Sequence, residues 1–135
     1  MRVAFVSYDF GEYCIRLASA LSERAEIQLW LPEHEAAPYL STLSPAVTLR
    51  TFVKPRLRQT FRQLRTTASL VREIRRYSPD VIHLQAGHLW FNCALPLLKR
   101  FPLVLTVHDP VHHVGDRGAR NTPQWIHDFG VYRAS

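Results

Sequence analysis

The sequence lacks several features that would place it in a specialised class of protein. It has no run of about 18 apolar residues that could span a membrane, and its opening segment Arg2–Tyr8 is too short an apolar run for a signal peptide. It has two cysteines, Cys14 and Cys93, which lie in apolar helical patterns and form no C-x-x-C motif. A disulfide framework is therefore not expected, and we predict a reducing, cytoplasmic location.

Acidic residues and lysine are scarce, whereas arginine is abundant. The 135 residues include 11 Asp and Glu against 17 Lys and Arg, 15 of them Arg, and the formal net charge is +6. An arginine-rich surface suits phosphates on nucleotides, lipid head groups or nucleic acid, and charge alone does not choose among them. With 47% apolar and 21% charged residues, the chain is expected to form one compact domain.

Short β-rich runs alternate with longer helical patterns along the chain. Strands are expected over Arg2–Tyr8, Ala25–Leu31, Val47–Val53, Asp80–Leu84 and Leu103–Val107, and helices over Glu12–Arg24, Glu33–Leu43, Leu57–Tyr77 and His88–Arg100. This alternation and right-handed crossovers predict an α/β fold with a Rossmann-like, doubly wound parallel sheet of order 3-2-1-4-5. A loop over Pro110–Asn121 and a final helix from Thr122 follow. Because that helical pattern runs to the last residue, we expect the chain to be part of a longer protein.

In such a sheet, ligands bind beyond the carboxyl ends of the strands, where the strand order reverses. Here that point lies between the first and fourth strands, and it is lined by the loops Tyr8–Glu12, Gln85–His88 and His108–His113. Within the first loop, Phe10-Gly11-Glu12 precedes a helix whose amino terminus suits a phosphate. Its acidic side chains would oppose an anion, so an ordinary turn between strand and helix is the alternative.

The other two loops carry polar residues that could meet a second ligand. Gln85, Gly87 and His88 follow the fourth strand, and His108 and Asp109 end the fifth. His108 could orient a hydroxyl, bind a phosphate oxygen or exchange a proton near neutral pH. The alternative for His108-Asp109 is a turn-forming pair.

A metal site is not expected. The segment His108-Asp109-x-x-His112-His113 has the residue types of a ligand cluster, but neither H-E-x-x-H nor C-x-x-C spacing occurs. A metal-dependent hydrolase that uses these four side chains is therefore the weakest reading. His83, inside the fourth strand, is expected to be a hydrogen-bonded core residue.

The helix expected over Leu57–Tyr77 carries an apolar stripe and a basic stripe. The apolar stripe has the spacing of a buried face and comprises Leu57, Phe61, Leu64, Ala68, Val71 and Ile74. The basic stripe comprises Arg58, Arg62, Arg65, Arg72 and Arg76. These arginines could rest on an anionic membrane surface, each contributing about 1 kcal/mol, and a solvated helix face is the alternative. Nucleic acid is not an expected partner, because interleaved aromatics and the usual binding signatures are absent.

Two segments resemble a known family. Ser78–Gln85 (S-P-D-V-I-H-L-Q), followed by a helix and by Pro102–Pro110 (P-L-V-L-T-V-H-D-P), resembles the P-D-V-I-H-x-H and P-x-V-x-T-x-H-D elements of family 4 retaining glycosyltransferases of the GT-B fold. The opening Met1–Ser7 is similar to their first strand, and the resemblance covers essentially the whole chain.

The resemblance implies that residues 1–135 are the acceptor-side half of a two-domain enzyme, whose other half binds a nucleotide sugar without a metal. It implies a catalytic role for His108 near the reacting sugar. Acceptor contacts are expected from Gln85, Gly87, His88 and Asp109, and donor-phosphate contacts from Phe10, Gly11 and Glu12. The family usually has two adjacent glycines in the first loop and often a histidine at the position of Gln85, so both contacts depart from its pattern. Without a donor half, this part is not expected to transfer sugar to a glycan, lipid-linked or small-molecule acceptor.

The main alternative is a non-catalytic Rossmann-like binding or regulatory domain. A response regulator is disfavoured, because it needs a phosphorylatable aspartate at the end of the third strand, where this chain has Phe52-Val53-Lys54. A downstream E-x7-E motif would support the transferase.

Overall fold

A computed structural model of the chain describes residues 1–106, in which five strands form one parallel sheet. The strands are β1 (Arg2–Ser7), β2 (Glu26–Pro32), β3 (Val47–Phe52), β4 (Val81–Ala86) and β5 (Leu103–Leu105). The order β3-β2-β1-β4-β5 confirms the predicted doubly wound topology. The predicted loop and last helix beyond residue 106 lie outside the described residues.

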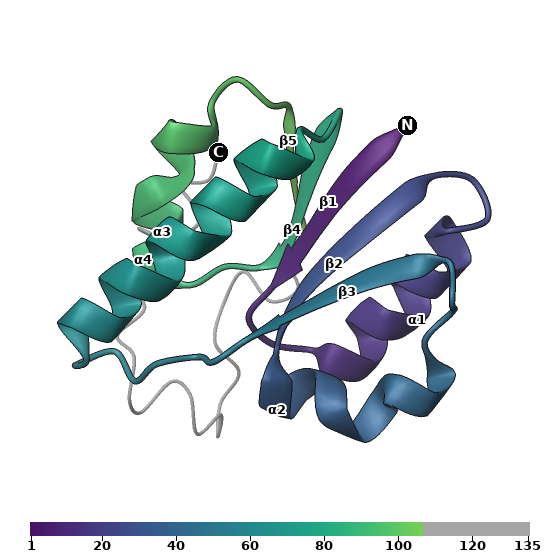
Figure 1. The fold of residues 1–135 in the computed structure, drawn as a ribbon, viewed down its shortest axis with the longest axis horizontal. Helices are drawn as coiled ribbons and strands as arrows, with labels where there is room; N and C mark the ends of the chain where they lie inside the picture. Colours follow the sequence, from purple (N-terminus) through teal and green to yellow (C-terminus); the bar gives the residue numbers. More distant parts are fainter. Residues whose placement is uncertain (107–135) are drawn as a thin grey trace, which may run out of the picture.

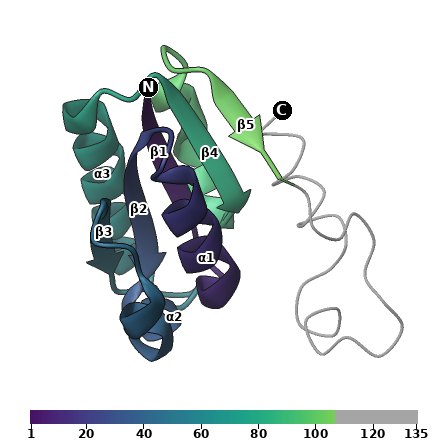
Figure 2. The same cartoon turned by 90° about the vertical axis from the view of Figure 1, so that its right-hand side faces the viewer.

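Helices cover both faces of the sheet (Figures 1 and 2). They are α1 (Gly11–Leu21), α2 (Glu33–Ala36), α3 (Thr60–Tyr77) and α4 (Leu89–Ala94), with 3-10 turns over Ala37–Thr42 and Leu95–Leu98. Alternate residues of β1 enter the two cores, because successive side chains of a strand point to opposite faces. Ala4 and Val6 pack with α3 and α4, whereas Val3 and Phe5 pack with α1 and α2.

Two predicted helices change character at proline. The segment after β2 is α-helical only to Ala36 and continues as a 3-10 helix with Pro38 in its first turn. The segment after β4 changes in the same way at Leu95, with Pro96 in the first 3-10 turn. Proline has no amide to donate to the preceding turn, which explains why both α-helices end there.

The apolar stripe predicted for α3 is wrong for Leu57, Phe61, Leu64 and Ala68, which are exposed, and right for Val71 and Ile74. The buried residues of the helix are Gln63, Thr67, Leu70, Val71 and Ile74. Leu57 precedes the helix, and Phe61 and Leu64 are 89% and 52% exposed. A polar residue takes the inward position, where Gln63 Nε2 donates to the Pro55 carbonyl oxygen at 2.9 Å. Gln63 Oε1 is buried and makes no hydrogen bond within the described residues. The amino-terminal half of α3 therefore turns apolar side chains outward.

The arginines of α3 are exposed. This is compatible both with contact to an anionic membrane surface and with a solvated helix face. They are Arg58, just before the helix, and Arg62, Arg65, Arg72 and Arg76 within it. No helix among residues 1–106 is both long and apolar enough to cross a membrane.

Candidate functional site at the carboxyl ends of the strands

The loop after β1 begins where β1 and β4 change register. The pairing shifts between Val6 and Ser7, and the Tyr8 amide donates to the Ala86 carbonyl oxygen at 3.0 Å. The Ser7 hydroxyl donates to the Asp9 carbonyl oxygen. Phe10 then adopts a left-handed backbone conformation, with φ of 62°, at the start of α1. These contacts give the loop a defined shape at the predicted edge of the sheet.

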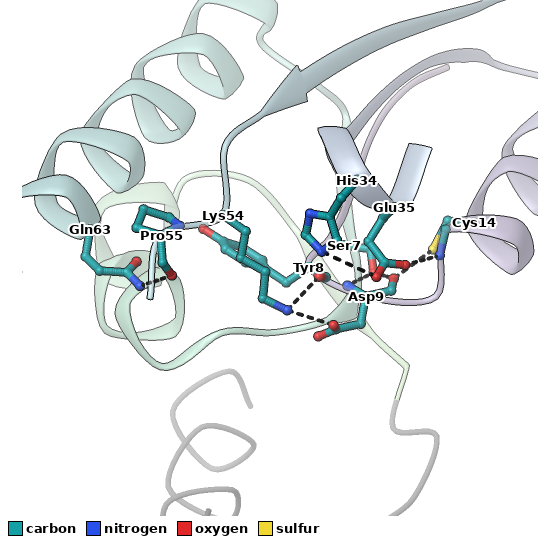
Figure 3. Close-up of polar contacts among 10 residues, drawn as sticks. Ser7, Tyr8, Asp9, Cys14, His34, Glu35, Lys54, Pro55 and Gln63 are labelled. Carbon is teal, nitrogen blue, oxygen red and sulfur yellow. Dashed lines mark hydrogen bonds and ion pairs between the residues drawn. The ribbon is translucent and has the colours of Figure 1, made fainter. Parts of the chain in front are cut away.

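Lys54 ties this loop to the end of β3 (Figure 3). Its Nζ donates to the Tyr8 carbonyl oxygen at 3.0 Å and to Asp9 Oδ1 at 2.7 Å. The Lys54 side chain is 24% exposed and that of Asp9 is 49% exposed, so the ion pair is partly shielded from water. Sequence analysis missed this role, although the position of Lys54 just after a strand pointed to the same edge.

Gly11 is in close contact with α2. Its amide donates to Glu35 Oε2 at 2.9 Å, and a Cβ at this position would lie 2.0 Å from the Glu35 carbonyl oxygen. Glycine is therefore required by backbone packing, and the carboxylate caps the positive end of α1. The amide that was predicted to meet a donor phosphate is bound to a side chain of the protein itself. Sequence analysis did not identify Glu35.

Cys14 and Tyr8 lie beneath this loop as protonated groups. Burial raises the pKa of the Cys14 thiol to about 11, and the nearby Glu35 and Asp9 carboxylates add to the effect. The Cys14 Sγ donates to the Asp9 carbonyl oxygen at 3.7 Å. Tyr8 is 1% exposed, and burial raises the pKa of its hydroxyl. Neither group is suited to act as a nucleophile at neutral pH.

His88, in the loop after β4, stacks on Tyr8. The ring centroids are 4.8 Å apart and the ring planes are inclined by 14°. Burial, together with the positive charge of Lys54, lowers the pKa of His88 to about 4, against a smaller opposing effect of Asp9. His88 is therefore a neutral imidazole at pH 7, which can exchange hydrogen bonds with a hydroxyl but carries no charge.

Gln85 belongs to a buried polar network. It is 1% exposed, and its Nε2 lies 2.8 Å from His83 Nε2 and 3.1 Å from Thr106 Oγ1. His83 Nε2 also lies 3.0 Å from Thr106 Oγ1, and burial lowers the pKa of His83. The hydrogen bonds predicted for His83 are present, but its side chain is half-buried and not a full core residue. Gln85 joins β4 to the residue that follows β5, so it would act on a ligand through its neighbours.

The remaining predicted site residues are distributed as follows. Glu12 is paired with Arg16, with 2.9 Å between Oε1 and Nη2, and Phe10 is 47% exposed. Gly87 is exposed, and a Cβ there would lie 2.5 Å from Asn92 Oδ1. The hypothesis of a metal-dependent hydrolase rests on four residues that lie outside the described residues: His108, Asp109, His112 and His113. Within residues 1–106, no group of three His, Cys, Asp or Glu side chains could hold a metal ion.

The structure thus brings the first loop, Lys54 and His88 together at the carboxyl edge of the sheet. This edge offers an exposed aromatic ring, an amino group paired with a carboxylate, a helix amino terminus and a neutral imidazole. Such groups can bind hydroxyls and phosphates.

Comparison with known proteins finds a family and a fold. Residues 11–134 match the model of Glycosyltransferase Family 4. The fold is similar to that of MurG from Acinetobacter baumannii, with a TM-score of 0.68 and 12% identity over 99% of this chain and 39% of that one. It is also similar to the carboxy-terminal domain of a hydrogenase from Pyrococcus furiosus, with a TM-score of 0.56 and 10% identity over 78% of this chain and 91% of that domain. The search of curated proteins finds no match.

Proposed function

The chain belongs to glycosyltransferase family 4, and from this membership we propose that it is the acceptor-side half of a GT-B enzyme that transfers a sugar from a nucleotide sugar. The observation that carries the proposal is the family match over residues 11–134. The sheet order and the similarity to the MurG fold support the architecture. Because the chain spans 39% of the MurG chain, we assign the donor site to a second domain. We further propose that the transfer retains the configuration of the sugar and needs no metal.

The acceptor is proposed to bind against the loop after β4. His88 supplies a neutral imidazole there, and Gly87 is exposed beside it. Gln85 is assigned a positioning role, because its amide holds His83 and Thr106 in place. Thr106 begins the T-V-H-D segment, so the same network would position the strand end that leads to His108 and Asp109. In this proposal His108 is the catalytic residue.

The donor phosphates are proposed to approach the loop Phe10–Glu12 at the start of α1. The Gly11 amide is already bound by Glu35, so a phosphate would displace that carboxylate or bind beside it. The acidic residues of this loop would repel a phosphate. Lys54 lies next to the loop and would supply a positive charge that attracts it. An anion could then exchange with Asp9 as the partner of Lys54.

The test is a screen of nucleotide sugars on the protein that contains both halves, with residues 1–135 alone as the control. We expect hydrolysis or transfer of one nucleotide sugar by the two-domain protein, and no turnover by residues 1–135. His108→Ala should lower turnover by about 10²- to 10⁴-fold if His108 exchanges a proton during catalysis. His112→Ala is the matched control and should leave turnover unchanged.

Three outcomes would contradict the proposal. Unchanged turnover in His108→Ala would remove His108 from catalysis. A folded two-domain protein that turns over no nucleotide sugar would favour a non-catalytic binding domain. Loss of turnover on chelation would contradict the metal-free transfer.

A further inference from the structure

The inner face of α3 carries two polar side chains, Gln63 and Thr67, at positions where a buried helix face usually has apolar ones. Their exposed fractions are 0% and 7%. They are four residues apart, so they are neighbours on one face of the helix. Because buried polar groups are nearly always hydrogen-bonded, both side chains require partners inside the protein.

Tyr8, the residue after β1, lies opposite this part of α3. It is 1% exposed and belongs to the same core cluster as Leu70 and Ile74 of the helix. Burial raises the pKa of the Tyr8 hydroxyl, and Thr67 opposes part of that rise, which places the two hydroxyls near each other. The Thr67 hydroxyl is therefore turned into the core towards Tyr8, and the phenol is protonated at neutral pH.

The segment after β3 brings Gln63 to the same region. Lys54 Nζ donates to the Tyr8 carbonyl oxygen at 3.0 Å, and the next residue, Pro55, accepts a hydrogen bond from Gln63 Nε2 at 2.9 Å. Figure 3 shows both contacts. The three buried polar side chains, Tyr8, Gln63 and Thr67, thus lie together between the end of β1 and α3.

Each of these three side chains has a polar atom without a hydrogen-bond partner in the part of the chain that the structure describes. The atoms are Tyr8 Oη, Thr67 Oγ1 and Gln63 Oε1. A threonine within a helix often donates to a carbonyl oxygen of the preceding turn, but Thr67 makes no such bond. A buried hydroxyl or amide oxygen without a partner is unfavourable, so a further molecule is expected among them.

We propose that Tyr8, Thr67 and Gln63 bind one internal water molecule between the end of β1 and α3. The water accepts hydrogen bonds from the two hydroxyls and donates one to Gln63 Oε1, which can only accept. About three hydrogen bonds is the usual number for a buried water. All three unpaired atoms are satisfied in this way.

Water fits this site better than an ion or a larger ligand. The three side chains are almost fully buried, so a ligand of several atoms would have to open the core to reach them. A cation is opposed by the Lys54 ammonium, which binds the same tyrosine, and an anion would be repelled by the Gln63 oxygen. A direct hydrogen bond from Tyr8 to Thr67 is the remaining alternative, and it would leave Gln63 Oε1 unpaired.

The water would fix the Tyr8 side chain at its far end. Lys54 holds the carbonyl oxygen of Tyr8, the water holds its hydroxyl, and His88 stacks on the ring between them with centroids 4.8 Å apart. The water site therefore lies beneath the candidate functional site and ties it to α3. The proposal does not depend on the proposed transferase activity, because it concerns groups inside the core.

The first test is a crystal structure of the full chain at a resolution that shows ordered water. We expect density for one isolated oxygen at about 2.6–3.2 Å from each of Tyr8 Oη, Thr67 Oγ1 and Gln63 Oε1. Contact between the Tyr8 and Thr67 hydroxyls, without density among the three atoms, would overturn the proposal.

The second test detects the water in solution, through the frequency dependence of the oxygen-17 relaxation of the solvent. This signal reports water oxygen, so exchange of the hydroxyl protons does not contribute. Thr67→Ile puts an ethyl group in place of the hydroxyl and should remove the contribution of one long-lived water, whereas Thr67→Ser should retain it. Thr66→Ile, at a half-buried threonine of the same helix, is the matched control and should also retain it.

The third test uses the sign of a stability change. Valine has the shape of threonine without the hydroxyl. If the Thr67 hydroxyl binds the water, Thr67→Val loses a hydrogen bond, and its unfolding equilibrium constant should rise about fivefold relative to that of Thr66→Val. If the hydroxyl is unpaired, its removal should instead make the protein more stable.

Three results in solution would contradict the proposal. Greater stability of Thr67→Val would show that the hydroxyl has no partner. Lower stability of Thr67→Val with an unchanged water signal in Thr67→Ile would assign a direct hydrogen bond between Tyr8 and Thr67. Equal losses of water signal in Thr67→Ile and Thr66→Ile would place the water elsewhere. If Thr67→Ile does not fold, as judged by near-ultraviolet circular dichroism, the crystal structure of the wild type still decides.

Discussion

The rings of Tyr8 and His88 stack with centroids 4.8 Å apart, and this contact joins the loop after β1 to the loop after β4. Lys54 binds the carbonyl oxygen of the same tyrosine at 3.0 Å. Three chain segments that are distant in sequence are thus held together at the edge where the strand order reverses. The contact also buries part of the His88 imidazole, which has a measurable consequence.

Stability should decrease as the pH falls from about 6.5 towards 4, the interval between the ordinary pKa of histidine and that of folded His88. In this interval the unfolded chain binds a proton that the folded chain excludes, so protonation favours unfolding. His83 acts in the same direction, because burial lowers its pKa too. Urea unfolding at a series of pH values measures the slope.

The slope should be reduced in His88→Gln, which has no group that takes up this proton. An unchanged slope in His88→Gln would show that His88 binds its proton over the same pH range in the folded and unfolded chains.

Gly11→Ala should destabilise the domain by about 3 kcal/mol or more, because the new Cβ would overlap the Glu35 carbonyl oxygen and force the backbone apart. Helix propensity alone predicts the opposite effect, a stabilisation of about 1 kcal/mol, because alanine is favoured over glycine in a helix. Gly87→Ala is the comparison, since its Cβ would meet the end of the Asn92 side chain, which can shift more easily than backbone. Chemical denaturation that finds Gly11→Ala as stable as the wild type would refute the close approach of α1 and α2.

Lys54→Met should loosen the loop after β1 with little effect on global stability. The side chain holds Asp9 and the Tyr8 carbonyl oxygen, but partly exposed ion pairs contribute only about 1 kcal/mol or less. Hydrogen exchange should therefore become faster at the amides of Tyr8–Gly11. Arg56→Met, a neighbouring exposed base, should leave these amides unchanged. Equal exchange rates in the two variants would mean that Lys54 does not fix the loop.

One of the two cysteines should react with a thiol reagent in the folded protein. Cys93 is exposed, whereas Cys14 is buried with a pKa of about 11, so its reactive thiolate is rare at pH 8. We expect one equivalent of modification by Ellman's reagent before unfolding and the second after it. Cys93→Ser should abolish the fast phase, and Cys14→Ser should not. Fast modification of both thiols would contradict the burial of Cys14.

Glu35→Gln should strengthen the binding of inorganic diphosphate to the start of α1, if the donor phosphates bind there as proposed. The amide oxygen can still accept from Gly11, but the negative charge that opposes an anion is removed. Glu33→Gln, in the same short helix and exposed, is the control for the change in net charge. Equal diphosphate affinities of the two variants, measured by calorimetry, would place the donor phosphates elsewhere.

The order of elements and the place of the site could be predicted from the sequence. Strand-like and helical patterns have different periods, and the handedness of crossovers leaves few arrangements of five parallel strands. Strand ends then locate the loops, which is why Gly11 and His88 were expected at one edge. Lys54 and Glu35 were missed, because their contacts join residues 45 and 24 positions apart in the chain.

The sequence by itself therefore determined the parallel α/β sheet, its order and the edge that carries the candidate site. Tertiary structure alone decided which face of α3 is buried and how accessible Gln85 is. The helical period permits more than one apolar face, and the fold buries Gln63 where its Nε2 donates to the Pro55 carbonyl oxygen. Gln85 is buried, and its amide lies within hydrogen-bond distance of His83 on the same strand and of Thr106, the residue after β5. Such choices depend on which hydrogen-bond partners the folded chain brings within reach, and periodicity carries no information about them.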